Sequence, residues 1–327
     1  MKNKTFLVVG GAGYIGSHTS WLLHKQGHKV IILDALLHNQ KFDHNWATLI
    51  QDDFSNTQTL DKIFSTYKID TVMHFAAFIE VGESVKKPKE FYNNNVTKTL
   101  TLLNSMLEHN VKNFIFSSSC AVYGIPQKLP LEETHPLAPI NPYGKNKLAV
   151  EFALQDYSAA YKLNYISLRY FNAAGSCYDQ GLGEQHVPET HVIPLLLRAA
   201  LNNKEFSIFG DNYPTTDGSC VRDYIHVLDI AQAHVLADKY LEEHAQSNVF
   251  NLGSQTGYTV KQLVQETEKI CNSKIKINIQ PQRPGDVPTL VANSAKAQQA
   301  LRWAPEYSTL ENILKSAYKW ELMLKEK

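Results

Sequence analysis

A glycine-rich turn near the start of the chain constrains the fold more than any other feature. The apolar run Phe6–Val9 is followed by glycines at positions 10, 11, 13 and 16, and then by a helix-like segment. Glycines at this spacing let the chain turn sharply and let a pyrophosphate approach the backbone, and the N–H groups of the next helix are free to bind phosphate. The sequence therefore predicts a strand, a turn and a helix that bind a dinucleotide.

A carboxylate downstream strengthens this prediction. The apolar run Val30–Leu33 ends in Asp34, about 20 residues beyond the turn, where an acidic side chain hydrogen bonds the adenosine ribose of a dinucleotide. Its charge would repel a 2′-phosphate, and no Arg or Lys follows before Lys41. The pattern favours NAD over NADP, and a glycine turn without a ligand is the alternative.

Further apolar runs that resemble strands follow, at Thr48–Ile50, Thr71–Phe75, Phe114–Phe116 and Tyr165–Phe171, with helix-like segments between them. This alternation predicts an α/β protein with a Rossmann-type doubly wound parallel sheet. After Asn172 Gly, Pro and Asp become frequent, and helices are predicted at Pro194–Asn202 and Leu228–Tyr240 and a strand at Val249–Leu252. We expect an NAD-binding domain at 1–174 and a smaller C-terminal substrate-binding domain at 175–327, with about 224–253 as a candidate to return to the first domain.

Small, polar or acidic residues stand where these strands end. Ligands of doubly wound sheets bind beyond the carboxyl ends of the strands, so we expect one shared cleft there. Its candidate residues include Asp53 and Phe54, for which a helix cap and a buried aromatic ring are the alternatives. The other strand ends are Phe75–Ala77, Ser117–Ser119 and Asn172–Ala174.

The bulk composition excludes several classes of protein. Lys+Arg and Asp+Glu number 32 each, which gives no electrostatic case for nucleic acid or an acidic membrane surface. The four cysteines are scattered, as in a reduced compartment, and no apolar run approaches the ~20 residues of a membrane helix. We expect a cytoplasmic protein. The thirteen histidines show no metal-ligand spacing, and we expect no metal.

Tyr143 and Lys147 belong to a segment that predicts a helix to about Tyr161, and their spacing puts them on one face of it. A phenol with a pKa near ~10 is a poor base at neutral pH, but a neighbouring ammonium favours the phenolate. Ser119, at a strand end upstream, can hydrogen bond the oxygen that Tyr143 deprotonates. We predict that Tyr143, Lys147 and Ser119 are the catalytic residues; a surface pair is the alternative for Tyr143 and Lys147 taken alone.

Together these features resemble the extended short-chain dehydrogenase/reductase superfamily, and longer runs resemble its UDP-glucose 4-epimerase family from residue 5 to about 304. The runs that carry this resemblance are His74–Ala77, Val81–Ser84, Asn93–Val96, Leu168–Asn172, Asp211–Thr215 and Val221–Val227.

The resemblance implies an isomerase that interconverts UDP-glucose and UDP-galactose through a transient 4-keto sugar, with an internally recycled NAD. It also implies a homodimer. Tyr143 would take the proton of the sugar 4-hydroxyl. The implied cofactor-binding residues are Gly10, Gly13, Tyr14, Ile15, Gly16, Asp34, Asp53, Phe54, Phe75, Ala76, Ala77, Asn95, Tyr143, Lys147 and Tyr170.

The implied substrate-binding residues lie mostly in the second half of the chain. Arg222 and Arg283 would bind the diphosphate, with structural ion pairs to Asp223 or Asp286 as the alternative, and Phe209 would stack on uracil. Asn172 would contact a phosphate oxygen and Asp286 a ribose hydroxyl. The full set is Ser119, Tyr143, Asn172, His191, Phe209, Arg222, Tyr224, Arg283, Asp286 and Leu290.

Some positions depart from the family pattern. Phe78-Ile79-Glu80 stands where many members have a Lys, His191 stands where Asn is frequent, and Leu290 is intermediate at a position tied to N-acetylated sugars. His74 and Asn95 are interpreted as structural or supporting residues.

Other functions are weighed against the epimerase. A 4,6-dehydratase would need an acid and a base where Cys120-Ala121 stands. An epimerase of UDP-N-acetylglucosamine, UDP-arabinose/xylose or UDP-glucuronate and an NAD-binding regulator remain alternatives.

Overall fold

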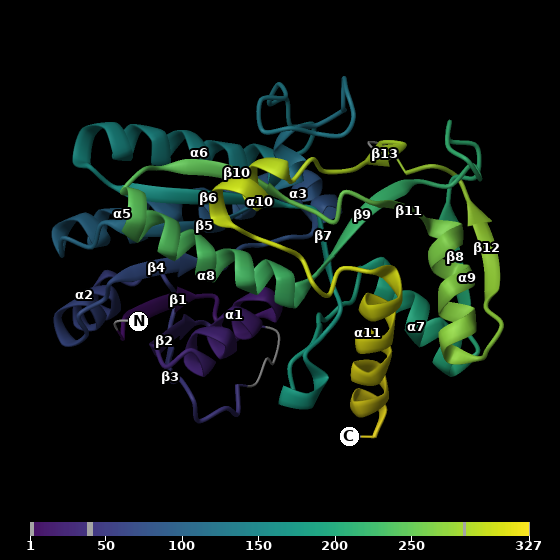
Figure 1. The fold of residues 1–327 in the computed structure, drawn as a ribbon, viewed down its shortest axis with the longest axis horizontal. Helices are drawn as coiled ribbons and strands as arrows, with labels where there is room; N and C mark the ends of the chain where they lie inside the picture. The colour runs from purple at the N-terminus through teal and green to yellow at the C-terminus, as the bar shows by residue number, and fades with distance from the viewer. Residues whose placement is uncertain (1–2, 38–41, 284–285, 327) are drawn as a thin grey trace.

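A parallel sheet of seven strands forms the centre of the protein (Figure 1), and the computed structural model describes residues 3–37, 42–283 and 286–326. The spatial order is β10-β6-β5-β4-β1-β2-β3, with every adjacent pair parallel. This order confirms the predicted α/β doubly wound sheet. The strands are β1 (Thr5–Val9), β2 (Lys29–Asp34), β3 (Thr48–Gln51), β4 (Thr71–His74), β5 (Asn113–Ser119), β6 (Asn164–Tyr170) and β10 (Asn248–Leu252).

Helices cover both faces of the sheet because successive strand residues point to opposite sides. In β1, Phe6 and Val8 join the core under one set of helices, whereas Leu7 and Val9 join the core under the other. The first set comprises α1 (Tyr14–Lys25), α8 (Val227–His244) and α10 (Ala295–Leu301). The second set comprises α2 (Thr57–Thr66), α5 (Lys98–Glu108) and α6 (Pro142–Tyr161).

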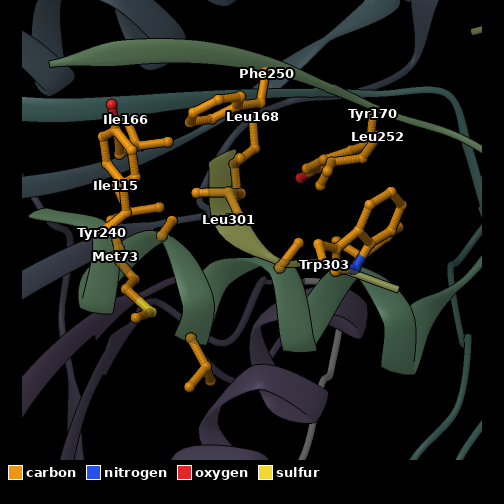
Figure 2. Packing of buried hydrophobic residues seen from close by; sticks show 14 of the residues in the cluster. Met73, Ile115, Ile166, Leu168, Tyr170, Tyr240, Phe250, Leu252, Leu301 and Trp303 are labelled. Atoms are coloured by element: carbon orange, nitrogen blue, oxygen red, sulfur yellow. The ribbon is translucent and has the colours of Figure 1, made fainter. Parts of the chain in front are cut away.

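Figure 2 shows the first of these cores, where Ile166, Leu168 and Phe250 of the sheet pack toward Tyr240 of α8 and Leu301 of α10. Each fully buried side chain of this kind contributes roughly 1.5–3 kcal/mol relative to exposure. The strand β10 was predicted at Val249–Leu252 from its apolar sequence. It lies beside β6 although about eighty residues separate them in the chain.

A second group of elements lies to one side of the main sheet, at the right of Figure 1. A four-stranded sheet joins β7 (Asn172–Ala174), β9 (Val221–His226), β11 (Gly257–Thr259) and β13 (Thr289–Leu290), and β8 (Glu205–Phe209) pairs with β12 (Lys276–Gln280). The helices α7 (Val192–Asn202), α9 (Val260–Cys271) and α11 (Leu310–Lys325) share a separate apolar core.

Short elements connect these layers. They are α3 (Val81–Lys86), α4 (Pro88–Tyr92), a π-helical turn (Asn93–Thr97) and 3-10 turns at Cys120–Val122 and Tyr178–Gln180. Because β7 follows β6 almost at once and pairs with β9, the carboxyl ends of the main sheet face the second group of elements. Within residues 3–37, 42–283 and 286–326, no helix has the length and apolar content needed to cross a membrane.

Candidate active site

The predicted glycine turn connects β1 to α1. Gly10 has φ +75°, and a Cβ on Gly16 would lie 2.2 Å from the Gly10 carbonyl oxygen, so α1 starts directly against the turn. No side chain caps α1, whose N-cap is Gly13. The first-turn N–H groups of α1, around Tyr14 and Ile15, can therefore serve a phosphate.

Asp34 lies at the end of β2, beside this turn. Its carboxylate accepts hydrogen bonds from the backbone N–H of Ala12 (3.0 Å) and of Leu36 (2.9 Å). Burial raises the pKa of Asp34, and these N–H groups act in the opposite direction. Asp34, the residue predicted to bind the adenosine ribose, is thus held at the glycine turn.

The segment Phe75–Ala77, which follows β4, also reaches the turn. The N–H groups of Phe75 and Ala76 donate to the carbonyl of Val9 at 2.8 and 3.1 Å. Phe75 packs on the ring of His234, with 4.6 Å between ring centres. The structure therefore brings the ends of β1, β2 and β4 together.

Asp53 and Phe54 follow β3, and their side chains contact other protein groups. Asp53 accepts hydrogen bonds from Ser55 and pairs with Lys98, while Phe54 is buried. Although burial alone would raise the pKa of Asp53, the Lys98 and Ser55 contacts lower it. The burial of Phe54 matches the core interpretation, whereas the side chain that caps α2 is that of Asn56 and not that of Asp53.

Ser119, Tyr143 and Lys147 lie together at the end of β5. Asn141 caps α6 by accepting from the N–H of Gly144 (2.9 Å), and a Cβ on Gly144 would lie 2.5 Å from the Ala121 carbonyl oxygen. Helix α6 therefore begins against the turn that follows Ser119. The Ser119 side chain acts on Tyr143 by lowering its pKa, and the Lys147 Nζ lies 5.8 Å from the centre of the Tyr143 ring.

The pKa values of these groups differ from the simple expectation. Burial raises the pKa of Tyr143 to about 12, although the hydrogen bond to Ser119 acts the other way. Burial lowers the pKa of Lys147 to about 7, with the Glu151 carboxylate opposing that shift. The expected lowering of the Tyr143 pKa is therefore not produced by the protein groups alone, because desolvation outweighs the Ser119 hydrogen bond.

A group of buried polar side chains close to these residues was not predicted from the sequence. The Ser118 hydroxyl donates to Glu151 (2.5 Å), and Glu151 binds Arg169 in a buried ion pair. Arg169 also donates to the Tyr123 hydroxyl (3.0 Å). Glu151 stands one helical turn after Lys147, and that spacing was the signal available in the sequence.

Lys147, Tyr170 and Asn95, which belong to the implied cofactor-binding set, hydrogen bond other protein groups beside the site. The Lys147 Nζ donates to the Ser117 carbonyl at 2.7 Å, and the Ser117 hydroxyl bonds the Tyr170 hydroxyl. Burial raises the pKa of Tyr170. Asn95 is buried and bonds the Phe78 N–H and carbonyl at 2.8 and 2.9 Å, so it fixes the segment that departs from the family pattern.

Asn172, His191 and Tyr224 line one small cavity of about 40 Å³ between β7, β9 and the start of α7. The Asn172 Nδ2 donates to the Asp223 carbonyl at 2.9 Å. Burial raises the pKa of Tyr224. The structure thus brings three of the implied substrate residues together.

Arg222, Asp286 and Leu290 form a second group. The Arg222 Nη1 donates to the carbonyls of Val221 (2.9 Å) and Val287 (2.8 Å), and its Nη2 lies 3.9 Å from Asp286. Leu290 pairs with Arg222 in the register of β13 and β9. The buried Asp223 carboxylate accepts hydrogen bonds from Ser254, Gln255 and Ala292 and not from Arg222.

Phe209 and Arg283 contact each other. The guanidinium carbon of Arg283 lies 3.6 Å from the centre of the Phe209 ring. One face of the ring that was expected to stack on uracil is therefore covered by Arg283.

The loop before α7 differs from what the sequence predicted. The histidines alone show no metal-ligand spacing, yet Glu184, His186, Glu189 and His191 present ligand atoms that all lie within 4.8 Å of one another. Burial alone would lower the pKa of both histidines, but the carboxylates raise it to about 9 for His186 and about 10 for His191. The signal was the mixed pattern Glu-x-His-x-x-Glu-x-His.

The doubly wound sheet, the glycine turn with Asp34, and the Ser119, Tyr143 and Lys147 group together define a protein of the short-chain dehydrogenase/reductase class. A family model described as GDP-mannose 4,6 dehydratase matches residues 7–316. The UDP-glucose 4-epimerase of Halalkalibacterium halodurans is 49% identical over 96% of this chain and 94% of its own length.

Solved structures agree with this comparison. UDP-glucose 4-epimerase from Brucella ovis, in complex with NAD, has a TM-score of 0.92 at 41% identity and covers 96% of this chain and 97% of its own. The enzyme from Bifidobacterium longum, in complex with NAD+ and UDP, has a TM-score of 0.87 at 36% identity, with 98% of both chains covered. The chain belongs to the UDP-glucose 4-epimerase family.

Proposed function

We propose that this protein is an isomerase that interconverts UDP-glucose and UDP-galactose by inverting C4 of the sugar, with NAD as a retained cofactor. The observation that carries this proposal is the assembly of Ser119, Tyr143 and Lys147 at the end of β5, on the sheet edge that also holds the glycine turn. The family relationship over nearly the whole chain supports the same reaction.

The residues present fit NAD. A Cβ on Gly13 would meet only the Gly10 carbonyl oxygen, at 3.3 Å, so no side chain crowds the backbone just before α1, and α1 has uncapped N–H groups. Asp34 would bind the adenosine ribose, and Tyr143, Lys147 and Tyr170 would hold the nicotinamide end. When bound, NAD reversibly accepts a hydride from C4 of the sugar.

The side chains of this chain handle the proton and the orientation. Tyr143 takes the proton of the sugar 4-hydroxyl and later returns it, while Ser119 orients the phenol. Because burial raises the pKa of Tyr143 to about 12, the phenolate requires positive charge nearby, and Lys147 can supply part of it. Inversion requires that the 4-keto sugar turn over, so the protein has to bind the nucleotide firmly and the sugar weakly.

The second group of elements suits the nucleotide. Arg222 is anchored through backbone carbonyls beside Asp286, which supports roles at the diphosphate and the ribose. Arg283 brings a second cation beside Phe209. Asn172, His191 and Tyr224 share a cavity, and Leu290 borders the sugar end from β13.

The same geometry disfavours a 4,6-dehydratase. Loss of water requires an additional acid and base after the serine, where this chain has Cys120 and Ala121. Burial raises the pKa of the Cys120 thiol to about 12, so it does not ionise near neutral pH, and alanine carries no titratable proton.

Three further features belong to the proposal. Residues 1–174, with about 224–253 returning to them, form the NAD-binding part, and the rest of 175–327 forms the UDP-sugar-binding part; the pairing of β10 with β6 supports this division. The protein acts in the cytoplasm. It forms a homodimer, which the exposed apolar residues of α3, α4 and α6 support.

Conversion of UDP-galactose without added cofactor tests the proposal. The wild-type protein should form UDP-glucose, and Tyr143→Phe should lose about 10²–10⁴ of turnover because the proton has no acceptor. Retained NAD is measured on denatured protein and should be unchanged in the variant. Tyr161→Phe, on an exposed site of the same helix, is the matched control and should keep wild-type turnover. Normal turnover in Tyr143→Phe would overturn the assignment of the base.

A further inference from the structure

The loop between the 3-10 turn at Tyr178–Gln180 and helix α7 holds a group of four titratable side chains, of which only His191 belongs to the proposed substrate-binding set. We propose that Glu184, His186, Glu189 and His191 bind one divalent transition-metal ion, for which zinc is the first probe. This site would be structural, and it adjoins the cavity that Asn172 and Tyr224 share with Glu184 and His191. It replaces the expectation that the protein has no metal.

The four side chains converge within a small volume. The His191 Nδ1 lies 2.8 Å from Glu184 Oε1 and 3.0 Å from Glu189 Oε1, and the His186 Nδ1 lies 3.3 Å from Glu184 Oε1. The glutamate side chains are only 7% and 2% exposed. Two buried carboxylates this close repel each other unless a cation lies between them.

The strongest sign of a ligand is an unsatisfied carboxylate oxygen. Glu189 Oε1 accepts hydrogen bonds from the N–H groups of Thr190 and His191, both at 2.9 Å. Glu189 Oε2 is buried and has no hydrogen-bond partner, and neither does the His186 Nδ1. These two atoms lie 3.8 Å apart. Buried polar atoms without partners are unfavourable, and an ion bound by both would satisfy them.

The nearby Arg198 guanidinium does not hydrogen bond the free Glu189 oxygen. The Arg198 Nη2 lies 3.9 Å from Glu189 Oε2, beyond hydrogen-bond distance, while its Nε donates to both oxygens of Glu321 at 3.1 and 2.9 Å. The hydrogen bonds of the Arg198 Nε thus go to Glu321 of α11.

The donor set matches a borderline divalent ion. Two imidazole nitrogens and two carboxylate oxygens form a four-coordinate set of the kind that Zn²⁺ accepts. Two carboxylates also balance the charge of a dication while both histidines stay neutral. Without an ion, charge balance would require two protonated histidines, which is the alternative.

Residues outside the group hold its backbone in place. The Trp320 Nε1 of α11 donates to the Glu184 carbonyl at 2.8 Å, and the rings of Tyr14 and His186 lie nearly perpendicular to each other with 6.4 Å between ring centres. The Tyr14 hydroxyl donates to the Gly175 carbonyl at 2.6 Å. An ion here would therefore join the loop to surroundings supplied by α1 and α11, and so add to the stability of the folded chain.

Zinc binding to the untagged full chain tests the proposal. The protein is treated with a chelator, dialysed against ZnCl₂ and then against buffer, and its bound metal is measured by mass spectrometry. We expect one Zn²⁺ per chain, a higher Tm with zinc than without it, and Co²⁺ binding with the absorption of a four-coordinate site. Glu189→Gln and His186→Gln should each weaken binding at least about tenfold.

His109→Gln is the matched control, because His109 contacts a carboxylate of Asp61 elsewhere on the protein; it should bind zinc as the wild type does. Circular dichroism checks that each variant is folded, and if Glu189→Gln is not, His186→Gln decides, since its side chain is 21% exposed. A wild-type chain that retains no zinc, or equal binding by His186→Gln, would overturn the proposal.

Discussion

Lys147 is a buried amine, 4% exposed, that contacts the Ser117 carbonyl and the face of the Phe116 ring. Burial lowers its pKa to about 7 from an ordinary value of 10.5. The unfolded chain therefore binds more protons than the folded chain between these two values. It follows that the contribution of Lys147 to the free energy of unfolding increases as the pH rises through this window.

Lys147→Met should remove this dependence, because methionine fills a similar volume without a titratable group. We expect the difference in unfolding free energy, wild type minus variant, to increase from about pH 7 to about pH 10. Urea unfolding at several pH values measures it. Lys145→Met, exposed on the same helix, is the control and should show a flat difference. A flat difference for Lys147→Met would mean that the lysine is charged in the folded protein.

The sequence predicts that Tyr143, Lys147 and Ser119 come together, but it does not reveal the other side chains that contact them. The spacing of Tyr143 and Lys147 follows from helix geometry, and the structure places both beside Ser119. Contacts between distant segments have no such local signal, as with Arg283 on Phe209. Whether the pKa of Tyr143 is raised or lowered also depends on burial, which a linear sequence does not reveal.

At the scale of elements, the glycine turn fixes where α1 starts. Gly16→Ala would put a Cβ 2.2 Å from the Gly10 carbonyl oxygen, so α1 would have to move away from β1. We expect loss of retained NAD and a decrease in the free energy of unfolding of roughly 1–3 kcal/mol. The NAD content of denatured protein and urea unfolding measure the two effects.

Gly82→Ala is the control for this change. A Cβ on Gly82, in helix α3, would have no atom within 4 Å. Alanine is the better helix former, so this variant should keep its NAD and gain roughly 0.5–1 kcal/mol of stability. Equal NAD retention by both variants would show that close approach at Gly16 is not required.

The elements themselves could largely be predicted, because each buried parallel strand is a short apolar run between helices. The boundaries shifted by a few residues: β5 extends through Ser119, and α8 continues to His244. The pairing of β7 with β9 could not be predicted. Those strands are short and far apart in the chain, and only the folded structure brings Asn172 beside Tyr224.

At the scale of the whole molecule, one surface combines exposed apolar side chains from adjoining helices. Val85 of α3 is 62% exposed, Tyr92 of α4 is 41% exposed, and Phe152 of α6 is 51% exposed. Helices α3, α4 and α6 pack against one another, so these side chains lie on adjoining helices. Exposed apolar groups clustered on adjoining helices indicate an interface, and an interface between two copies of the chain closes most simply with two-fold symmetry.

For the proposed homodimer, Phe152→Asp should therefore shift the protein from dimer to monomer. An aspartate on this face would place like charges against each other across a two-fold axis and would lose the apolar area that Phe152 buries there. Light scattering after gel filtration gives the mass of each form. Leu195→Asp is the control, because Leu195 is 37% exposed on α7, at the other side of the molecule in Figure 1, and this variant should stay dimeric. If Phe152→Asp stays dimeric while Leu195→Asp dissociates, the subunits meet through α7 instead.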